Sequence, residues 1–192
     1  MYSSGGKGIK RYNGESFESL IDLYSNGFIL EPCLKNERNF REFHEPSLNT
    51  VRVGTVHLND RTEIPFAFVR FGKDGNCIDN ARAGGIMGLV DVDSGVIVAA
   101  CDEDRNHFVF HPNSHKQIIG FGIPMWEEAK KLVRQLAEIV PENRYTGWDI
   151  ALTEDGWVLI EANCKGQFVA QIPLKEGFRD KFDSYLKDLG LE

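Results

Sequence analysis

The sequence predicts an α+β fold, and two observations support this prediction. Short apolar runs rich in β-branched residues fill the middle of the chain, between helical patterns near both ends. Tight turns such as Asp93-Ser94-Gly95 join successive runs, which is typical of antiparallel hairpins. A doubly wound parallel sheet would instead alternate each strand with a helix. The 192 residues are enough for one sizeable core or two small lobes.

The first elements are a helix and a short strand. Apolar residues recur at helical spacing over residues 15–24, and Asn26-Gly27 is expected to end this helix. The run FILEPCL at 28–34 predicts a short buried strand. The charged residues 35–45 that follow it predict a helical turn.

The later elements are hairpins and two longer helices. Pro124 and two acidic residues after it are typical of the first turn of a helix. Alternating apolar runs bounded by turn residues predict the strands. The expected elements are strands over 49–58 and 64–72, a hairpin over 84–102, a short strand within 106–114, a helix over 124–139, a hairpin over 145–163 and an amphipathic helix over 175–189.

Composition and charge exclude several classes of function. The formal net charge is −7 and the basic residues are scattered, so no nucleic-acid partner is expected. No apolar run approaches the roughly 20 residues of a membrane span, and the N-terminus lacks the apolar core of a secretory signal. The 4 cysteines are widely spaced without a CxxC pair. Reduced thiols and a cytoplasmic location are the simplest interpretation.

Polar oxygens interrupt the apolar hairpin YTGWDIALTEDGWVLIEAN at Asp149, Glu161 and Asn163. A three-residue loop over 154–156 would place Asp149 directly opposite Glu161, with Asn163 on the same face. Two opposed carboxylates repel each other unless a cation lies between them, and such oxygens are the ligands that Mg²⁺ prefers. The pattern therefore predicts a magnesium site. Two alternatives remain: a two-residue loop at Asp155-Gly156, which would separate the carboxylates, and solvated positions on an edge strand.

The N-terminus carries a second candidate, a glycine-rich loop. Gly5, Gly6 and Gly8 surround Lys7. Glycines allow backbone N–H groups to approach a phosphate closely, and the lysine adds positive charge. The GxxxxGK[ST] spacing of a P-loop is absent. The loop predicts a phosphate contact, and the alternative is a terminus rich in glycine for its freedom alone.

Taken together, these motifs resemble the ATP-grasp superfamily, and most closely its sugar-transfer-associated proteins. The matching motifs keep the family's order over nearly the whole chain: SSGGKGI, FILEPCL, PSLNTVRVGT, IDNARAGGI, HPNSHKQIIGFGIPMWEEA and GWDIALTEDGWVLIEAN. The resemblance implies that Lys7 and its glycines form the flexible loop over the ATP phosphates. It also implies that Arg52 contacts a phosphate or acyl-phosphate during catalysis.

The resemblance implies roles at three further places. Asp149, Glu161 and Asn163 match the family's magnesium ligands, in agreement with the hairpin register. The hinge between two lobes would lie at FILEPCL, where backbone groups would read the adenine edge; its residues are Glu31, Pro32 and Cys33. The substrate side of the cleft would include Asn80, Arg82, Gly84 and Gly85.

The implied activity is that of an ATP- and Mg²⁺-dependent ligase. A small-molecule carboxylate would be activated as an acyl-phosphate and attacked by an amine, in polysaccharide or cell-envelope biosynthesis. The implied fold has two lobes with antiparallel sheets flanked by helices. Residues 1–35 would be a remnant of the small lobe, and residues 36–192 the large lobe with the metal site.

One departure from the family's pattern leaves other functions open. The family has an N-terminal domain and a lysine-bearing strand before the glycine loop, and this sequence starts at the loop. We therefore expect the chain to be the C-terminal portion of a longer protein, whose N-terminal domain would be a partner. The alternatives are a non-catalytic nucleotide-binding module or fragment, and an ATP-grasp kinase that acts on a hydroxyl.

Overall fold

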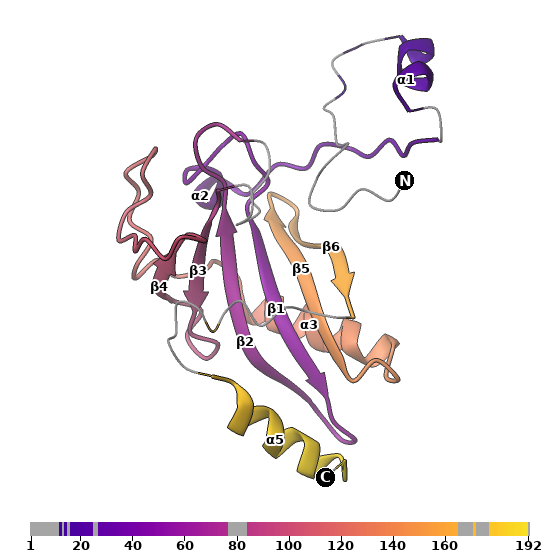
Figure 1. Cartoon of the computed structure of the whole chain (residues 1–192), viewed down its shortest axis with the longest axis vertical. Coiled ribbons are helices and arrows are strands. Elements are labelled where there is room, and N and C mark those ends of the chain that lie inside the picture. Colours follow the sequence, from indigo (N-terminus) through magenta and orange to yellow (C-terminus); the bar gives the residue numbers. More distant parts are fainter. Residues whose placement is uncertain are drawn as a thin grey trace.

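A single antiparallel sheet forms the body of the α+β fold (Figure 1). Its strand order is β4-β3-β2-β1-β5-β6, and every neighbouring pair is antiparallel. The strands are β1 Thr50–His57, β2 Thr62–Phe71, β3 Ile86–Val90, β4 Ile97–Cys101, β5 Tyr145–Thr153 and β6 Gly156–Asn163. The computed structural model describes residues 12, 14, 16–24, 27–76, 84–164, 171 and 177–191.

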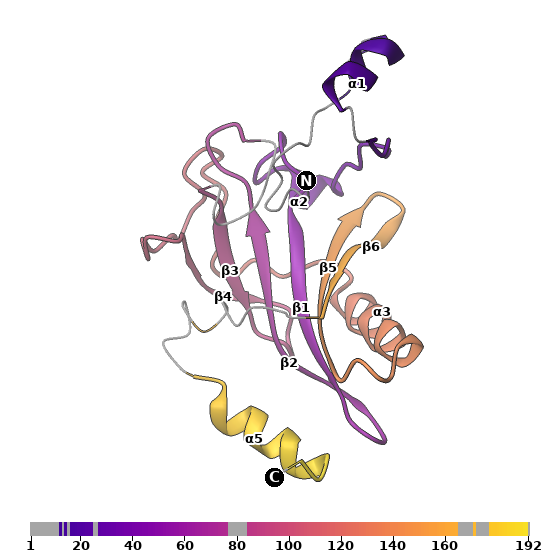
Figure 2. The same cartoon turned by 45° about the vertical axis from the view of Figure 1, so that its right-hand side comes forward.

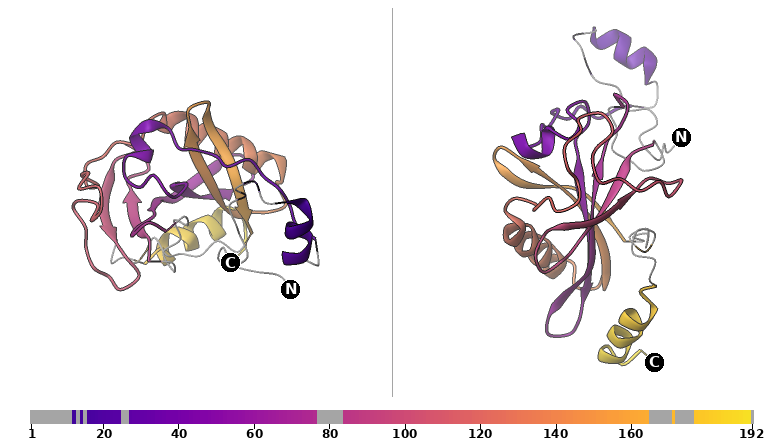
Figure 3. Two further views of the ribbon diagram at one scale, coloured as in Figure 1. Left: turned by 90° about the horizontal axis from the view of Figure 1, so that it is seen from above. Right: turned by 90° about the vertical axis from the view of Figure 1, so that its left-hand side faces the viewer.

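Helices lie on both faces of this sheet. Helix α3 packs against one face, and α5 lies on the other side near the lower end of the sheet (Figure 3). Two shorter helices precede the sheet at its upper end (Figure 2). Over the part of the chain that the structure describes, no helix has the length and apolar character of a membrane span. The helices are α1 Phe17–Leu23, α2 Arg38–Arg41, α3 Trp126–Ile139 and α5 Arg179–Asp188.

Strand β2 shows why the sheet needs cover on both faces. Its residues alternate between two apolar clusters, because successive side chains in a strand point to opposite faces. Ala67 and Val69 belong to the main cluster with α3, whereas Phe66 and Phe68 belong to a smaller cluster against which α5 packs. Phe66 stacks on Phe178, with ring centroids 5.3 Å apart. A polar group on either face of this central strand is therefore shielded from water.

The N-terminal elements depart from the sequence-based expectation. Helix α1 forms as predicted, but only Leu20 of its apolar residues is buried. The buried strand predicted over 28–34 is wrong: this segment is extended, has no strand partner among the described residues, and leaves Ile29 84% exposed. An apolar run forms a strand only where a neighbouring strand offers its ladder of hydrogen bonds.

The segment joins the body of the protein at Asn36. The Asn36 side chain is buried, donates from Nδ2 to the carbonyl of Asn49 at 2.8 Å, and accepts from the backbone N–H of Asn49 at 2.7 Å.

The short strand predicted within 106–114 is also absent. Isolated bridges at His107 and Phe110 take its place, because this loop crosses over the edge of β4 rather than extending the sheet.

Substitution of Gly95 by Ala tests how tightly the β3–β4 turn is packed. Gly95 has φ +72°, and a Cβ atom there would lie 2.5 Å from Cγ of Trp126. We expect Gly95→Ala to lower the free energy of unfolding by about 2–4 kcal/mol, because backbone strain and overpacking add. Gly75→Ala is the matched control, since Gly75 has φ +75° with nothing within 4 Å of the added atom. Urea denaturation should show the smaller loss there, and equal losses would contradict the packing argument.

Candidate functional site

The β5–β6 hairpin has a different turn from the one predicted. Thr153 pairs with Gly156, so the loop has two residues, Glu154 and Asp155, rather than three. The Thr153 hydroxyl explains the tighter turn: it accepts from the backbone N–H of Asp155 at 3.2 Å and donates to the carbonyl of Gly156 at 2.9 Å. With this loop alone, the regular register would place Asp149 opposite Ile160.

A β-bulge restores the predicted pairing. Ile150 pairs with Leu159 but Asp149 pairs with Glu161, so Ile160 is the extra residue of the bulge. A bulge opposes two residues to one and shifts every later pair by one position. Asp149 and Glu161 therefore face each other across the hairpin, as expected, although the turn that was to bring this about is wrong.

The three polar residues of the hairpin share one face of the sheet but differ in exposure. Asp149 is 2% exposed, Glu161 is exposed and Asn163 is half-buried. The amide nitrogen Nδ2 of Asn163 is buried without a hydrogen-bond partner in the described structure. The two ends of an amide exchange by a 180° rotation, so Oδ1 can occupy the same position. Two carboxylates and an amide suit a hard divalent cation in their chemistry.

Arg52 is the nearest partner of Asp149. The register of β1 and β5 places the two residues directly opposite each other. The guanidinium donates from Nε to Oδ1 of Asp149 and from Nη2 to Oδ2, the second bond at 2.7 Å. This bidentate geometry is the strongest form of ion pair between side chains. The structure thus brings together Arg52, predicted as a phosphate contact, and Asp149, predicted as a metal ligand.

Arg70 on strand β2 is a further member of the site, and sequence reasoning missed it. Its Nη2 lies 3.0 Å from Oδ2 of Asp149. Its Nε and Nη2 donate to the hydroxyl of Thr50 at 2.8 and 2.6 Å. The signal that could have identified it is a single arginine within the apolar strand FAFVRF, where a buried charge needs a partner.

The charge on Arg52 is held firmly by these contacts. Burial lowers the pKa of Arg52, but the hydrogen bond and the charge of Asp149 raise it by more, so the net pKa lies above its ordinary value. Burial also raises the pKa of Tyr145, on the same strand as Asp149, to about 12, although the charge of Arg52 opposes this shift. At neutral pH the site therefore combines a permanent guanidinium with a neutral phenol.

Other predicted site residues lie elsewhere or outside the described structure. Glu31, Pro32 and Cys33 are exposed on the extended segment between α1 and α2. Gly84 and Gly85 directly precede β3, in which Met87 is the strand partner of Arg70. The chain just before β3 therefore enters the sheet beside the arginine of the site. The predicted residues outside the described part are Gly5, Gly6, Lys7, Gly8, Asn80 and Arg82.

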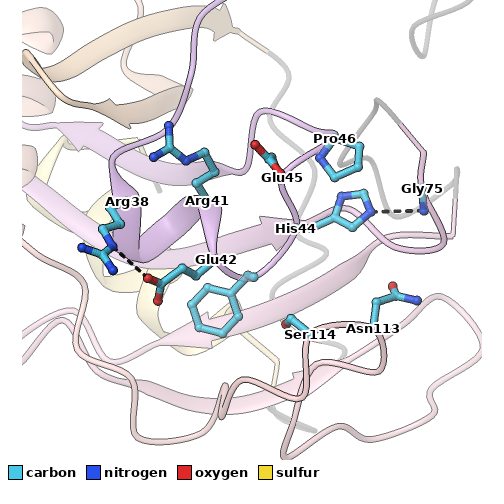
Figure 4. Close-up of a pocket in the computed structure, with 10 residues that line it drawn as sticks. Arg38, Arg41, Glu42, His44, Glu45, Pro46, Gly75, Asn113 and Ser114 are labelled. Atoms are coloured by element: carbon cyan, nitrogen blue, oxygen red, sulfur yellow. Dashed lines mark hydrogen bonds and ion pairs between the residues drawn. The ribbon is translucent and has the colours of Figure 1, made fainter.

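A pocket of about 550 Å³ lies away from this cluster, beside α2 (Figure 4). Arg38, Glu42 and His44 are among its lining residues, whereas Asp149 and its arginines are not. Arg38 pairs with Glu42 at 3.2 Å, and both side chains are largely exposed. Exposed ion pairs of this kind contribute little and do not mark a site for chemistry. We therefore assign the candidate site to the sheet face with Asp149.

Comparison with protein families decides the relationship. The model of the sugar-transfer associated ATP-grasp family matches residues 1–186. The chain belongs to this family. The match confirms the resemblance seen in the sequence, and ATP-grasp membership indicates an ATP-dependent enzyme of ligase type. ATP-grasp proteins generally use ATP and Mg²⁺. A search of curated proteins found no match to the chain.

Removal of Arg52 tests whether the buried ion pair supports the ATP-grasp sheet. Arg52→Met leaves the Asp149 carboxylate buried with Arg70 as its main counter-charge, and we expect the free energy of unfolding to fall by about 3 kcal/mol. Arg61→Met is the control, because the Arg61 side chain is 48% exposed in its ion pairs. Its loss should be much smaller, because exposed ion pairs contribute little to stability. Chemical denaturation of both variants makes the comparison, and similar losses would argue against a structural role for the buried pair.

Two buried histidines near the pocket generate a pH prediction. His44 accepts from the N–H of Gly75 at 3.2 Å, and Nε2 of His111 donates to the carbonyl of Gly72 at 2.8 Å. Burial lowers the pKa of both imidazoles. The unfolded chain therefore binds more protons just below pH 6.5, so stability is fully present above about pH 6.5 and is lost as pH falls through the folded-state pKa values.

Denaturation curves between pH 5 and pH 8 should show this loss. His111→Gln, which keeps a side-chain N–H donor, should flatten the dependence, whereas His107→Gln at an exposed position should leave it unchanged. A wild-type stability that does not change between pH 7 and pH 5.5 would contradict the prediction.

Proposed function

We propose that the chain takes part in an ATP- and Mg²⁺-dependent ligase reaction on the sheet face that carries Asp149. The observation behind this proposal is the arrangement of charges across four neighbouring strands of the sheet, β2, β1, β5 and β6. Arg52 and Glu161 flank Asp149 as its two strand partners, and Arg70 reaches the same carboxylate from β2. The two positive groups lie on β2 and β1 and the two negative groups on β5 and β6, and such adjacent positive and negative groups suit a metal–nucleotide complex, which carries both signs of charge.

Mg²⁺ would be held by Asp149, Glu161 and Asn163. A metal held by these residues would supply Lewis-acid stabilisation of the negative charge on the phosphates. The exposure of Glu161 leaves it open to such a ligand, and the unsatisfied amide of Asn163 offers an oxygen after rotation. Among the residues described there is no set of three His, Cys, Asp or Glu side chains suited to a metal. Oxygens from the nucleotide and water would therefore complete the coordination.

The arginines would stabilise the charge that develops during phosphoryl transfer. Arg52 is bidentate and keeps its charge, so it needs no reorganisation when the γ-phosphoryl group moves. Lys7 of the glycine loop, which lies outside the described residues, would add a further cation. The residues Glu31, Pro32 and Cys33 would contact the adenine edge through their backbone.

The substrates would be a small-molecule carboxylate and an amine. The carboxylate would attack the γ-phosphorus, ADP would leave, and the amine would displace phosphate from the acyl-phosphate. The family's association with sugar transfer motivates the proposal of a role in making polysaccharide or cell-envelope precursors, which we place in the cytoplasm. The residues proposed for the substrate side are Asn80, Arg82, Gly84 and Gly85. Hydroxylamine trapping would yield a hydroxamate from an acyl-phosphate but not from a kinase product.

The decisive experiment neutralises Glu161. Glu161→Gln removes one charge from an exposed side chain, and we expect ATP turnover to fall by about 10²–10³-fold, because metal-assisted charge stabilisation is lost. The double variant with Asp149→Asn should abolish turnover and Mg²⁺-dependent nucleotide binding. Phosphate release and isothermal titration measure these two quantities.

Glu154→Gln is the matched control, because it makes the same substitution at the tip of the same hairpin. It should keep wild-type turnover, and circular dichroism should show that all variants are folded. Unchanged turnover in the double variant would remove the proposed site. Nucleotide binding without phosphate release in the wild type would favour a binding module.

A further inference from the structure

The Asp149 carboxylate is already heavily engaged by cations from two neighbouring strands. Arg52 donates to both of its oxygens, and Arg70 adds a second contact to Oδ2 at 3.0 Å. A carboxylate has about four lone-pair positions. The two hydrogen bonds from Arg52 occupy one position on each oxygen, and the positive charge of Arg70 lies beside Oδ2 as an ion-pair partner. A metal ion that binds Asp149 must compete with these two guanidinium groups for the carboxylate.

Arg70 is the guanidinium that can be displaced more easily. Arg52 donates two hydrogen bonds to Asp149 and lies directly opposite it in the sheet, whereas Arg70 makes an ion pair with it at 3.0 Å from a strand that does not pair with β5. The Thr50 hydroxyl, which accepts from Nε and Nη2 of Arg70, holds the guanidinium in this position. Thr50 and Arg70 are strand partners, so the Thr50 hydroxyl holds the Arg70 side chain in the orientation that contacts the Asp149 carboxylate.

The charges of the four side chains suggest what happens when the ligand arrives. Arg52 and Arg70 balance Asp149 and Glu161, so the described site is close to neutral. A divalent cation alone would add positive charge next to two guanidinium groups, which is unfavourable at such short range. A nucleotide triphosphate carries enough negative charge to take over the guanidinium that the metal displaces from Asp149.

We propose that Arg70 is a nucleotide-binding residue that blocks metal binding until nucleotide is present. It holds Asp149 in the free protein and exchanges this partner for a nucleotide phosphate when the metal binds the carboxylate. The exchange couples the two ligands, so that metal and nucleotide each strengthen the binding of the other. This inference rests on the proposed function and assigns Arg70 a part in it.

The test compares Mn²⁺ binding with and without a non-hydrolysable ATP analogue, measured by electron paramagnetic resonance of the free metal ion. For Arg70→Gln we expect Mn²⁺ alone to bind about tenfold more tightly than to the wild type, because a competing cation is gone. In the presence of the analogue, Arg70→Gln should bind Mn²⁺ no more tightly than the wild type does, because the nucleotide phosphate has lost the guanidinium of Arg70 as its partner. An arginine that only braces the sheet would weaken both measurements together.

Two further variants keep the test decisive. Arg61→Gln makes the same change of net charge at an exposed ion-paired arginine and should leave both affinities unchanged. Thr50→Val removes the hydroxyl that aims Arg70, and it should tighten the binding of Mn²⁺ alone by about threefold. This variant decides the question if Arg70→Gln does not fold, as judged by circular dichroism.

The outcomes separate this inference from the proposed function. The first outcome is that the wild type binds Mn²⁺ with the analogue, but neither Arg70→Gln nor Thr50→Val tightens the binding of Mn²⁺ alone. Arg70 then does not control metal binding, and only this inference fails. If the wild type binds no Mn²⁺ even with the analogue, the proposed function fails, and the role of Arg70 fails with it.

Discussion

The buried negative charge of Asp149 is the constraint on which the candidate site depends. A carboxylate at 2% exposure needs compensation, and the sheet supplies it from the two strands on one side of β5. Because Arg52 and Arg70 come from consecutive strands β1 and β2, the order of strands and their register are both required for the pairing. The apolar residues around them exclude water, which strengthens the attraction and makes an unpaired charge costly.

The sheet combines this polar cluster with two apolar layers. On the face that α3 covers, buried apolar residues of the strands, such as Val51, pack against apolar residues of α3, such as Ala137. This cluster contains most of the buried apolar side chains. Among the described residues, the opposite face has a smaller apolar cluster, where Phe178 and Phe182 pack against a group that includes the phenylalanines of β2. The polar cluster occupies another part of that same face. Stability and chemistry are thus divided between the two sides of one sheet, so a substitution on the α3 face is expected to affect folding before it affects the site.

Much of the fold follows from patterns that are local in the sequence. The hairpin over 84–102, the helix at Trp126–Ile139 and the strands around Arg52 come from periodicity and turn residues, which need no knowledge of distant contacts. Failures occur where the decisive partner is distant or absent. The run at 28–34 has the composition of a strand but no described neighbour, and Arg70 becomes meaningful only when β1 places Thr50 and β5 places Asp149 beside it. The pairing of Asp149 with Glu161 was reached through an incorrect turn, since a bulge cannot be identified from apolar alternation alone. Their role as metal ligands stays a prediction.

The extra residue Ile160 has a consequence for how such hairpins are compared between proteins. A longer turn without a bulge and a shorter turn with one bring the same two carboxylates opposite each other. The pairing of the acidic residues is then the same in both hairpins, although the additional residue lies at a different position. An alignment that matches the tips of two hairpins would then shift their acidic positions by one place. Two such hairpins are therefore best superposed on the carboxylate oxygens of their acidic residues rather than on the turn that joins the strands.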